Sequence, residues 1–120
     1  VSAVIVSAAV TATASLRTDR AQQQVYLTVS SAAELLRDSV LNGRPCTYLK
    51  MDVEGAEREA IAGARQTIER DRPKLNIAAY HRSEDFFELP LLIHSLCADY
   101  ALYLRHHPYV PAWDTNLYAR

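Results

Sequence analysis

The sequence predicts an α/β protein in which helices pack against one layered sheet. Short runs of β-branched and apolar residues alternate with longer segments whose apolar residues recur at helical spacing. The last two strand-like runs are joined by a loop short enough for an antiparallel return. With 120 residues, 49% of them hydrophobic, the chain suits a single domain with one core. The predicted order of elements is β-α-β-α-β-α-β-β.

The amino-terminal part has the least specific pattern. Residues 1–13 are rich in Val, Ile and Thr, which is typical of a strand, although their Ala and Ser content also fits a helix. Residues 16–24 are polar and predict a loop or an exposed tail. Residues 25–29 predict a strand, and residues 32–41 a helix that a Ser-Ser pair caps and an Asn-Gly pair ends.

The remaining elements follow with clearer boundaries. Strands are predicted over residues 47–51, 75–80, 101–106 and 115–119, with one helix over residues 54–70 and another that has Pro90 at its first position and runs through Cys97. An Asp-Arg-Pro break separates the first of these helices from the strand that follows it.

A dense acidic turn follows the strand at residues 47–51. It contains Asp52, Glu54 and Glu57 around Gly55. In open parallel α/β sheets, ligands bind at the carboxyl ends of the strands. Three carboxylates at this place predict a functional site.

A second interpretation of the acidic turn is purely structural. Acidic residues in the first turn of a helix are stabilised by about 0.3–1 kcal/mol each. Glu54 also stands four residues before Arg58, and Arg65 four before Glu69, as in ordinary helix-surface ion pairs. This interpretation accounts for Glu54 and Glu57 more easily than for Asp52, which directly follows an apolar strand.

Composition excludes several classes of partner. A net charge of −1, from 13 basic and 14 acidic residues, predicts binding neither to nucleic acid nor to an anionic membrane. No apolar run approaches the roughly 18 residues of a spanning helix, so we expect a soluble, cytoplasmic protein. Cys46 and Cys97 lack metal-ligand spacing and are predicted to be buried thiols, with a single disulfide as the alternative. The absence of an initiator Met suggests a piece of a longer protein.

Several short motifs in order resemble the carboxyl half of the FkbM-like methyltransferases. The resemblance covers residues 47–119, whereas residues 1–46 match poorly. It is carried by Lys50-Met51-Asp52-Val53-Glu54-Gly55-Ala56-Glu57, Gly63-Ala64, Pro73-Lys74-Leu75, Tyr80-His81, Leu89-Pro90, Tyr103-Leu104-Arg105-His106 and Asp114-Thr115. It implies a class I, S-adenosylmethionine-dependent O-methyltransferase. The implied fold is a partial Rossmann-like sheet of strands four to seven, with the last strand antiparallel and helices flanking it.

The chain also departs from this family. Members carry an Asp-x-Gly-x-x-x-Gly-like loop on strand one and an acidic residue after strand two, which hold the cofactor. This chain has neither, and its glycines are Gly43, Gly55 and Gly63. We therefore expect a methyltransferase fragment without the cofactor loop, whose cofactor-binding residues are unknown. The alternative is a non-catalytic remnant or interaction module.

Methyl transfer to a hydroxyl requires loss of the hydroxyl proton, so a positioned base is useful. Asp52, Glu54 and His81 are the catalytic candidates, because each follows the carboxyl end of a predicted strand. The two carboxylates would also suit Mg²⁺ or Ca²⁺. Spacing supplies no further ligands, so no metal site is assigned.

A basic cluster after the sixth strand predicts contacts with the acceptor, a small molecule or a glycan. Its residues are Arg105, His106 and His107, and Asp114 lies beyond the loop that follows. Alternatively, Arg105 and Asp114 form a surface ion pair worth under about 1 kcal/mol. Nearby aromatic residues are assigned to packing.

A half sheet would leave the strand at residues 47–51 without a neighbour on one side. Unpaired strand edges promote association. We therefore expect either self-association through this edge or coverage of the edge by a segment within residues 1–29.

Overall fold

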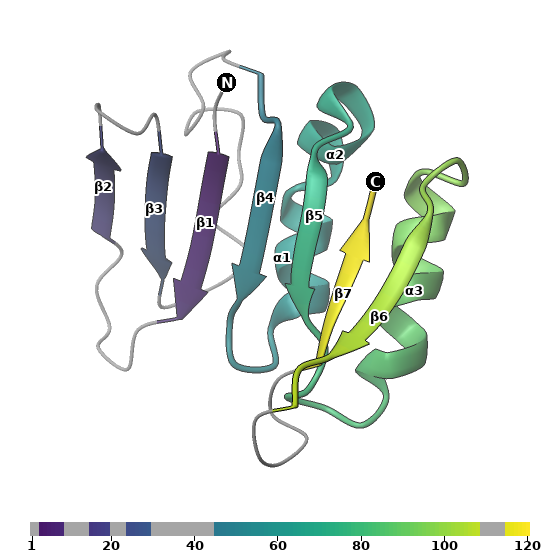
Figure 1. The fold of residues 1–120 in the computed structure, drawn as a ribbon. Helices are drawn as coiled ribbons and strands as arrows, with labels where there is room; N and C mark the ends of the chain where they lie inside the picture. The colour runs from purple at the N-terminus through teal and green to yellow at the C-terminus, as the bar shows by residue number, and fades with distance from the viewer. Residues whose placement is uncertain (1–2, 9–14, 20–23, 30–44, 109–114) are drawn as a thin grey trace.

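The computed structural model describes residues 3–8, 15–19, 24–29, 45–108 and 115–120. These residues form a seven-stranded sheet in the order β2-β3-β1-β4-β5-β7-β6. The strands are β1 (Ala3–Ala8), β2 (Ser15–Asp19), β3 (Gln24–Val29), β4 (Tyr48–Asp52), β5 (Lys74–Ala78), β6 (Leu102–His106) and β7 (Thr115–Ala119). The helices of the described part are α1 (Glu57–Gly63), α2 (Arg65–Asp71) and α3 (Asp85–Leu96), and all of them lie on one face of the sheet (Figure 1).

The carboxyl-terminal half of the sheet follows the predicted pattern. β4 and β5 are parallel, and β7 lies antiparallel between β5 and β6. The predicted antiparallel ending is therefore confirmed. The carboxyl ends of β4 and β5 meet at the same edge of the sheet, the lower edge in Figure 1.

The sheet extends beyond the four strands predicted for residues 47–119. β1 pairs in parallel with β4, from Ala3 opposite Tyr48 to Ser7 opposite Asp52. The expectation of a free edge at β4 is therefore wrong, and the alternative, coverage by a segment within residues 1–29, is confirmed. Self-association of the chain stays a prediction.

The polar segment at residues 16–24 was predicted to be a loop or an exposed tail, and this prediction is wrong for residues 16–19 and 24, whereas residues 20–23 lie outside the described part of the chain. β2 pairs antiparallel with β3, from Ser15 opposite Thr28 to Asp19 opposite Gln24. An edge strand needs backbone pairing on one side only, so pairing can outweigh a weak side-chain pattern. The helix predicted over residues 32–41 lies outside the described residues.

The helix predicted over residues 54–70 begins later than expected and is divided in two. α1 starts only at Glu57, because a tight turn occupies the residues before it. Between α1 and α2, the Ala64 N–H is shared by the carbonyls of Ala60 and Ile61, at 2.9 and 3.1 Å. Such bifurcated, 3₁₀-like closure is common at helix ends. The ion pairs also differ in part, since Arg65 pairs with Glu69 as predicted whereas Arg58 pairs with Glu88.

Pro90 does not begin a helix as predicted. α3 starts at Asp85, and Pro90 lies inside it. Proline lacks the N–H that would close one helical hydrogen bond. The helix nevertheless continues to Leu96, with Leu89 and Ile93 buried on its inner face.

The core lies between the helices and the carboxyl-terminal half of the sheet. β4 alternates between buried and partly exposed residues, so that Leu49 and Met51 face the helices while Lys50 and Asp52 lie on the other face. The fully buried large side chains are Leu49, Met51, Ile61, Ile68, Leu75, Ile77, Leu89, Ile93 and Leu117, together with Glu57. One face of the sheet is thus apolar and covered by helices, and the other carries polar side chains from β4.

Both cysteines are buried and free, as predicted, and they form no disulfide. Burial raises the pKa of the Cys46 thiol to about 11. The backbone N–H of Cys46 donates to Asp71 Oδ2 at 2.8 Å and so connects the start of β4 to the end of α2. Among the described helices, none is long and apolar enough to cross a membrane.

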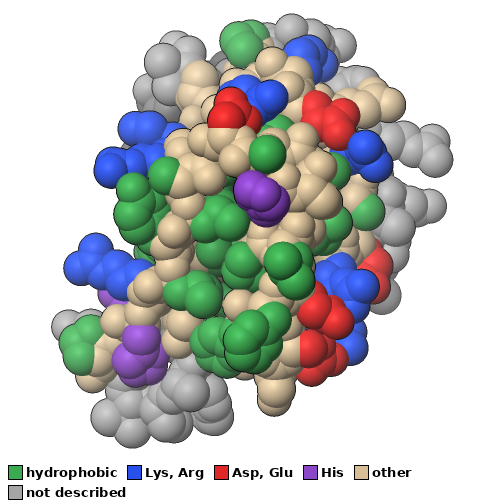
Figure 2. All heavy atoms as spheres, turned by 90° about the vertical axis from the view of Figure 1, so that its right-hand side faces the viewer, with side chains coloured by type: hydrophobic (Ala, Val, Ile, Leu, Met, Phe, Trp, Pro, Cys, Tyr) green, Lys and Arg blue, Asp and Glu red, His purple; other side chains and the backbone are tan. Residues whose placement is uncertain are grey.

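Apolar side chains are exposed where α3 lies beside β6. Phe87, Leu91 and Leu104 all have large exposed fractions there, whereas the exposed Tyr103 lines a separate pocket with Arg105 and Tyr118. Figure 2 views the molecule from this side and shows hydrophobic side chains among polar ones. Phe87, Leu91 and Leu104 line a shallow groove together with Pro90 and Leu102.

Two leucines on α3 provide a test of this packing. Leu89 is wholly buried, whereas Leu91 is 69% exposed. We expect Leu89→Ala to lower the free energy of unfolding by about 2–5 kcal/mol and Leu91→Ala to change it by less than about 0.5 kcal/mol. Urea denaturation of both variants measures the difference. Similar losses from the two substitutions would contradict the placement of α3.

Candidate active site

A tight turn connects β4 to α1. The Ala56 N–H donates to the Val53 carbonyl at 3.1 Å, and Glu54 and Gly55 have φ values of 53° and 93°. Two positive φ values in the central positions are typical of a type I′ turn. Gly55 adopts this conformation without strain, whereas Glu54 is an uncommon residue in the left-handed region. The turn places the carboxylates of the acidic segment close together at the end of β4.

Glu57 is the first residue of α1, and its side chain is completely buried. Its Oε1 atom accepts the Val53 N–H at 3.0 Å and pairs with His81 Nδ1 at 2.8 Å. A buried carboxylate is tolerated only when it is paired and hydrogen-bonded. Glu57 therefore fixes the turn to the segment that follows β5.

This contact defines the orientation of the His81 ring. Because an ionised carboxylate only accepts hydrogen bonds, we assign the proton to Nδ1 of His81. Nε2 then faces the other two carboxylates of the turn, 3.6 Å from Asp52 Oδ1 and 3.5 Å from Glu54 Oε2. His81 is thus positioned by one carboxylate and directed at two more.

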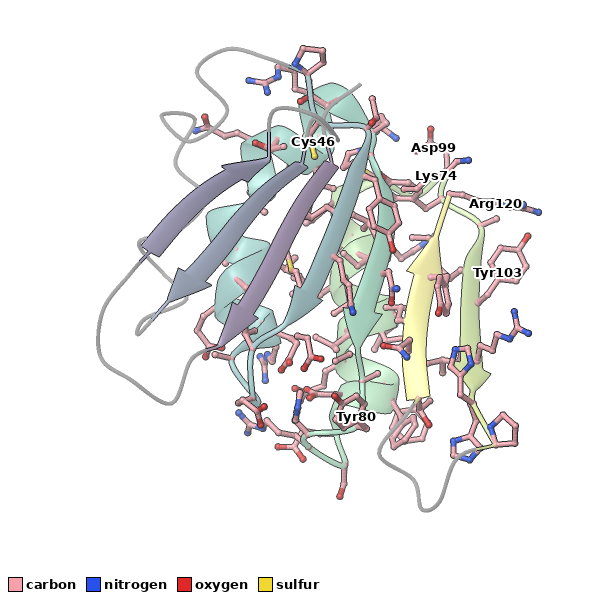
Figure 3. All side chains as sticks on the ribbon, turned by 60° about the vertical axis from the view of Figure 1, so that its left-hand side comes forward. Cys46, Lys74, Tyr80, Asp99, Tyr103 and Arg120 are labelled. Carbon is pink, nitrogen blue, oxygen red and sulfur yellow. The ribbon has the colours of Figure 1, made fainter. Side chains whose placement is uncertain are left out.

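Asp52 lies at the carboxyl end of β4 and remains partly exposed. The Tyr80 hydroxyl donates to both of its carboxylate oxygens, at 3.2 and 3.3 Å. The rings of Tyr80 and His81 lie 4.2 Å apart, centroid to centroid. Figure 3 shows Tyr80 beyond the end of β5, at the edge of the sheet where β4 also ends.

The three predicted catalytic residues therefore come together. Asp52, Glu54 and His81 each offer a ligand atom, and these atoms lie within 4.8 Å of one another. Their catalytic roles remain a prediction. Glu57 was interpreted mainly as a helix-start residue, and nothing in its sequence position distinguishes a buried carboxylate from an exposed one.

The predicted acceptor-binding residues are more widely separated. His106 Nδ1 is hydrogen-bonded to Thr115 Oγ1 at 2.9 Å, on the strand paired with it. Asp114 lies outside the described residues, so its pairing with Arg105 is untested. Arg105 lines a pocket with Tyr103, Tyr118 and Arg120. None of these contacts joins Arg105 or His106 to the Asp52 cluster.

A polar pocket does adjoin Asp52, and sequence reasoning missed most of its residues. Asp52 and Tyr80 line it together with Lys50, Asn76, His107, Asn116 and Tyr118. Most of these side chains come from β4, β5 and β7, whereas Tyr80 follows β5 and His107 follows β6. His107, not His106, contributes here, and its Nε2 lies 3.3 Å from the Tyr118 hydroxyl.

Unpartnered carboxylate oxygens lie close to Glu57. Both carboxylate oxygens of Asp85 and the Oε2 atom of Glu57 are buried without a hydrogen-bond partner among the described residues. Burial raises the pKa of Asp85, and the charge of Glu57 raises it further. Arg82, the cation nearest in sequence, pairs with Glu84.

Comparison with known proteins gives a consistent result. The model of the methyltransferase FkbM domain matches residues 3–111. A crystal structure of methyltransferase FkbM from Methylobacillus flagellatus KT is 35% identical in sequence, with a TM-score of 0.65. The match covers 91% of this chain but 26% of that one, so this chain spans about a quarter of the relative's length. No curated protein matches the chain.

Gly55 provides a test of the turn that builds the cluster. A Cβ atom at Gly55 would meet its nearest neighbours at 3.7–3.8 Å, so substitution is disfavoured by the backbone and not by a clash. We expect Gly55→Ala to lower the free energy of unfolding by about 1–2 kcal/mol. Gly63→Ala is the control, because replacing glycine by alanine in a helix raises the free energy of unfolding by up to about 1 kcal/mol. Thermal denaturation that ranks the two variants in the opposite order would contradict the turn geometry.

Proposed function

Because the chain belongs to the FkbM methyltransferase family, we propose that it forms the acceptor side of an S-adenosylmethionine-dependent O-methyltransferase. The observation that supports this most directly is the cluster of Asp52, His81 and Glu57 where β4 and β5 end. Ligands of open α/β sheets bind at this edge. A Rossmann-like class I arrangement, with its last strand antiparallel, agrees with the order β4-β5-β7-β6.

The proposed reaction transfers a methyl group from a sulfonium to a hydroxyl oxygen. A C–O bond forms as the S–CH₃ bond breaks in line with it, and the sulfur leaves as a neutral thioether. The hydroxyl proton passes to a protein base during or before attack. The family implies S-adenosylmethionine as methyl donor, and the residues of this chain would act on the acceptor.

Asp52 is the preferred base. Its carboxylate is partly exposed, adjoins the polar pocket and is held by the Tyr80 hydroxyl. His81 is the second candidate, because its Nε2 atom is directed at the same space. Glu57 is a positioning residue that acts through His81, and Glu54 contributes charge at the entrance, where its side chain is 73% exposed.

The polar pocket supports a hydroxyl-bearing acceptor. Amide, ammonium and phenol groups from Asn76, Lys50 and Tyr118 can bind the several oxygens of a polar small molecule or a glycan. Tyr118 also lines the neighbouring pocket with Arg105. A larger acceptor would therefore reach Arg105, which keeps that residue as a proposed acceptor contact, together with His106 and Asp114.

The cofactor would be bound mainly by parts of the enzyme other than this chain. The family's glycine loop is absent from the sequence, and the match covers only 26% of the relative with a solved structure. The same absence favours a second candidate function, a non-catalytic module that keeps the sheet without the cofactor site.

Asp52→Asn tests the base assignment in the full-length enzyme. We expect turnover to fall at least about a hundredfold with an unchanged melting temperature, because asparagine cannot accept the proton. Glu59→Gln is the matched control, since Glu59 is exposed in the first turn of α1 and carries the same charge. Glu57 is unsuitable as a control because it holds His81. Equal, small effects of the two substitutions would reject Asp52 as the base and leave His81.

Cofactor binding by residues 1–120 alone tests the proposed division of the site. Without the glycine loop to bring backbone N–H groups to the methionine carboxylate, we expect no saturable binding of S-adenosylmethionine by calorimetry at micromolar concentrations. The full-length enzyme should bind it under the same conditions. Saturable binding by the isolated chain would show that the cofactor site is misplaced, and failure of the full-length protein to bind would favour the non-catalytic module.

A further inference from the structure

The contacts of His81 with its neighbouring carboxylates favour a positive charge between His81 Nε2, Asp52 and Glu54. With Nδ1 donating to Glu57, the Nε2 lone pair of neutral His81 faces two carboxylates that also only accept hydrogen bonds. Three hydrogen-bond acceptors, one nitrogen and two carboxylate oxygens, therefore lie close together with no donor between them. Either a proton on Nε2 or a cation held by all three groups resolves this conflict.

We propose that Asp52, Glu54 and His81 bind a divalent cation with tetrahedral preference, Zn²⁺ being the best fit. Nitrogen and oxygen ligands from one imidazole and two carboxylates suit this ion better than the all-oxygen sites of Ca²⁺. A mixed donor set also distinguishes the site from an ordinary acidic surface cluster.

The distances support the tetrahedral assignment. His81 Nε2 lies 3.6 Å from Asp52 Oδ1 and 3.5 Å from Glu54 Oε2. Bonds of about 2.1 Å to one ion would span these two separations at about 115°, close to the tetrahedral angle and wider than the right angles of octahedral Mg²⁺. The third pair, Asp52 and Glu54, lies within 4.8 Å, and the exposed Glu54 side chain would adjust to close it around the ion. Three protein ligands leave a fourth position open, as in catalytic zinc sites.

Residues around the three ligands have the arrangement that metal sites require. Glu57 holds the imidazole through Nδ1, as carboxylates do behind metal-binding histidines, and the Tyr80 hydroxyl holds Asp52. Glu57 Oε2 and both oxygens of Asp85 are buried without hydrogen-bond partners among the described residues. The raised pKa of Asp85 favours its neutral form, so the assignment rests on the ligand geometry and on the Glu57 carboxylate behind His81.

The open position would face the polar pocket that Asp52 lines. An acceptor hydroxyl bound there would lose its proton more readily, because a bound cation lowers the pKa of a coordinated oxygen. The proton would pass to Asp52 Oδ2, because Asp52 Oδ1 and His81 Nε2 would be occupied by the ion. This catalytic role rests on the proposed function, whereas binding of the ion does not.

The test is titration of Zn²⁺ into untagged, chelator-treated residues 1–120, followed by calorimetry. We expect saturation at one ion per chain with an affinity on the order of micromolar or tighter. Mg²⁺ at the same concentrations should give no comparable signal. Absence of saturable Zn²⁺ binding would overturn the proposal and leave the protonated His81 ion pair.

Matched variants locate the ion. Glu54→Gln removes an exposed ligand without disturbing the core and should weaken binding at least tenfold, whereas Glu59→Gln, on the same segment, should not change it. Glu57→Gln should weaken binding about 10–100-fold through loss of His81 orientation, and circular dichroism checks that it folds. Equal affinities of Glu54→Gln and Glu59→Gln would place the zinc elsewhere and overturn the proposal.

Measuring methyl transfer in the presence of a chelator distinguishes failure of this inference from failure of the proposed function. In the full-length enzyme, a chelator should abolish turnover and added Zn²⁺ should restore it. Turnover that persists in chelator, in a protein that does not bind Zn²⁺, would reject the cation site and leave the methyltransferase assignment intact.

Discussion

The buried carboxylate of Glu57 connects the turn after β4 to the segment after β5. One oxygen accepts both the Val53 N–H of the β4–α1 turn and the His81 Nδ1–H that follows β5. Hydrogen bonds to charged groups contribute about 1.5–3 kcal/mol, and removal of one partner leaves a buried charge that costs more. The turn and the histidine are therefore held in one arrangement, because each satisfies the same oxygen.

The alternation of β4 places this arrangement at a boundary between two environments. Leu49 and Met51 anchor the strand in the core under the helices, while Lys50 and Asp52 lie on the polar face. Because the strand is packed into the core on one face, the side chains on its other face are held in nearly fixed positions. The polar pocket next to Asp52 therefore rests on the same strands that form the apolar core, including β5 and β7.

Local strain accompanies the site. Glu54 adopts a positive φ directly beside the three converging ligand atoms, in a turn that glycine would adopt more easily. Such conformations persist only where the surrounding structure imposes them. Here the Val53–Ala56 hydrogen bond and the buried Glu57 side chain provide that constraint.

The sequence by itself determined the strands from β4 to β7 and the acidic turn. Apolar spacing is a local property, so the strands at Tyr48–Asp52 and Thr115–Ala119 and the buried cysteines could be predicted from short windows. Membership of the methyltransferase family could also be predicted from the sequence, because the family's motifs lie close together in the chain. The meeting of Asp52 and His81 followed from the rule that parallel strands end at one edge.

Only the tertiary structure decided which groups lie next to one another across the sheet. The pairing of β1 with β4, the burial of Glu57 and the position of His107 in place of His106 at the polar pocket all depend on strand order and register. His106 pairs with Thr115 inside the ladder, whereas His107 lies just beyond it and is free to turn toward Tyr118. Contacts between residues distant in sequence leave no local pattern, because each strand's periodicity records which face is buried and not which neighbour covers it.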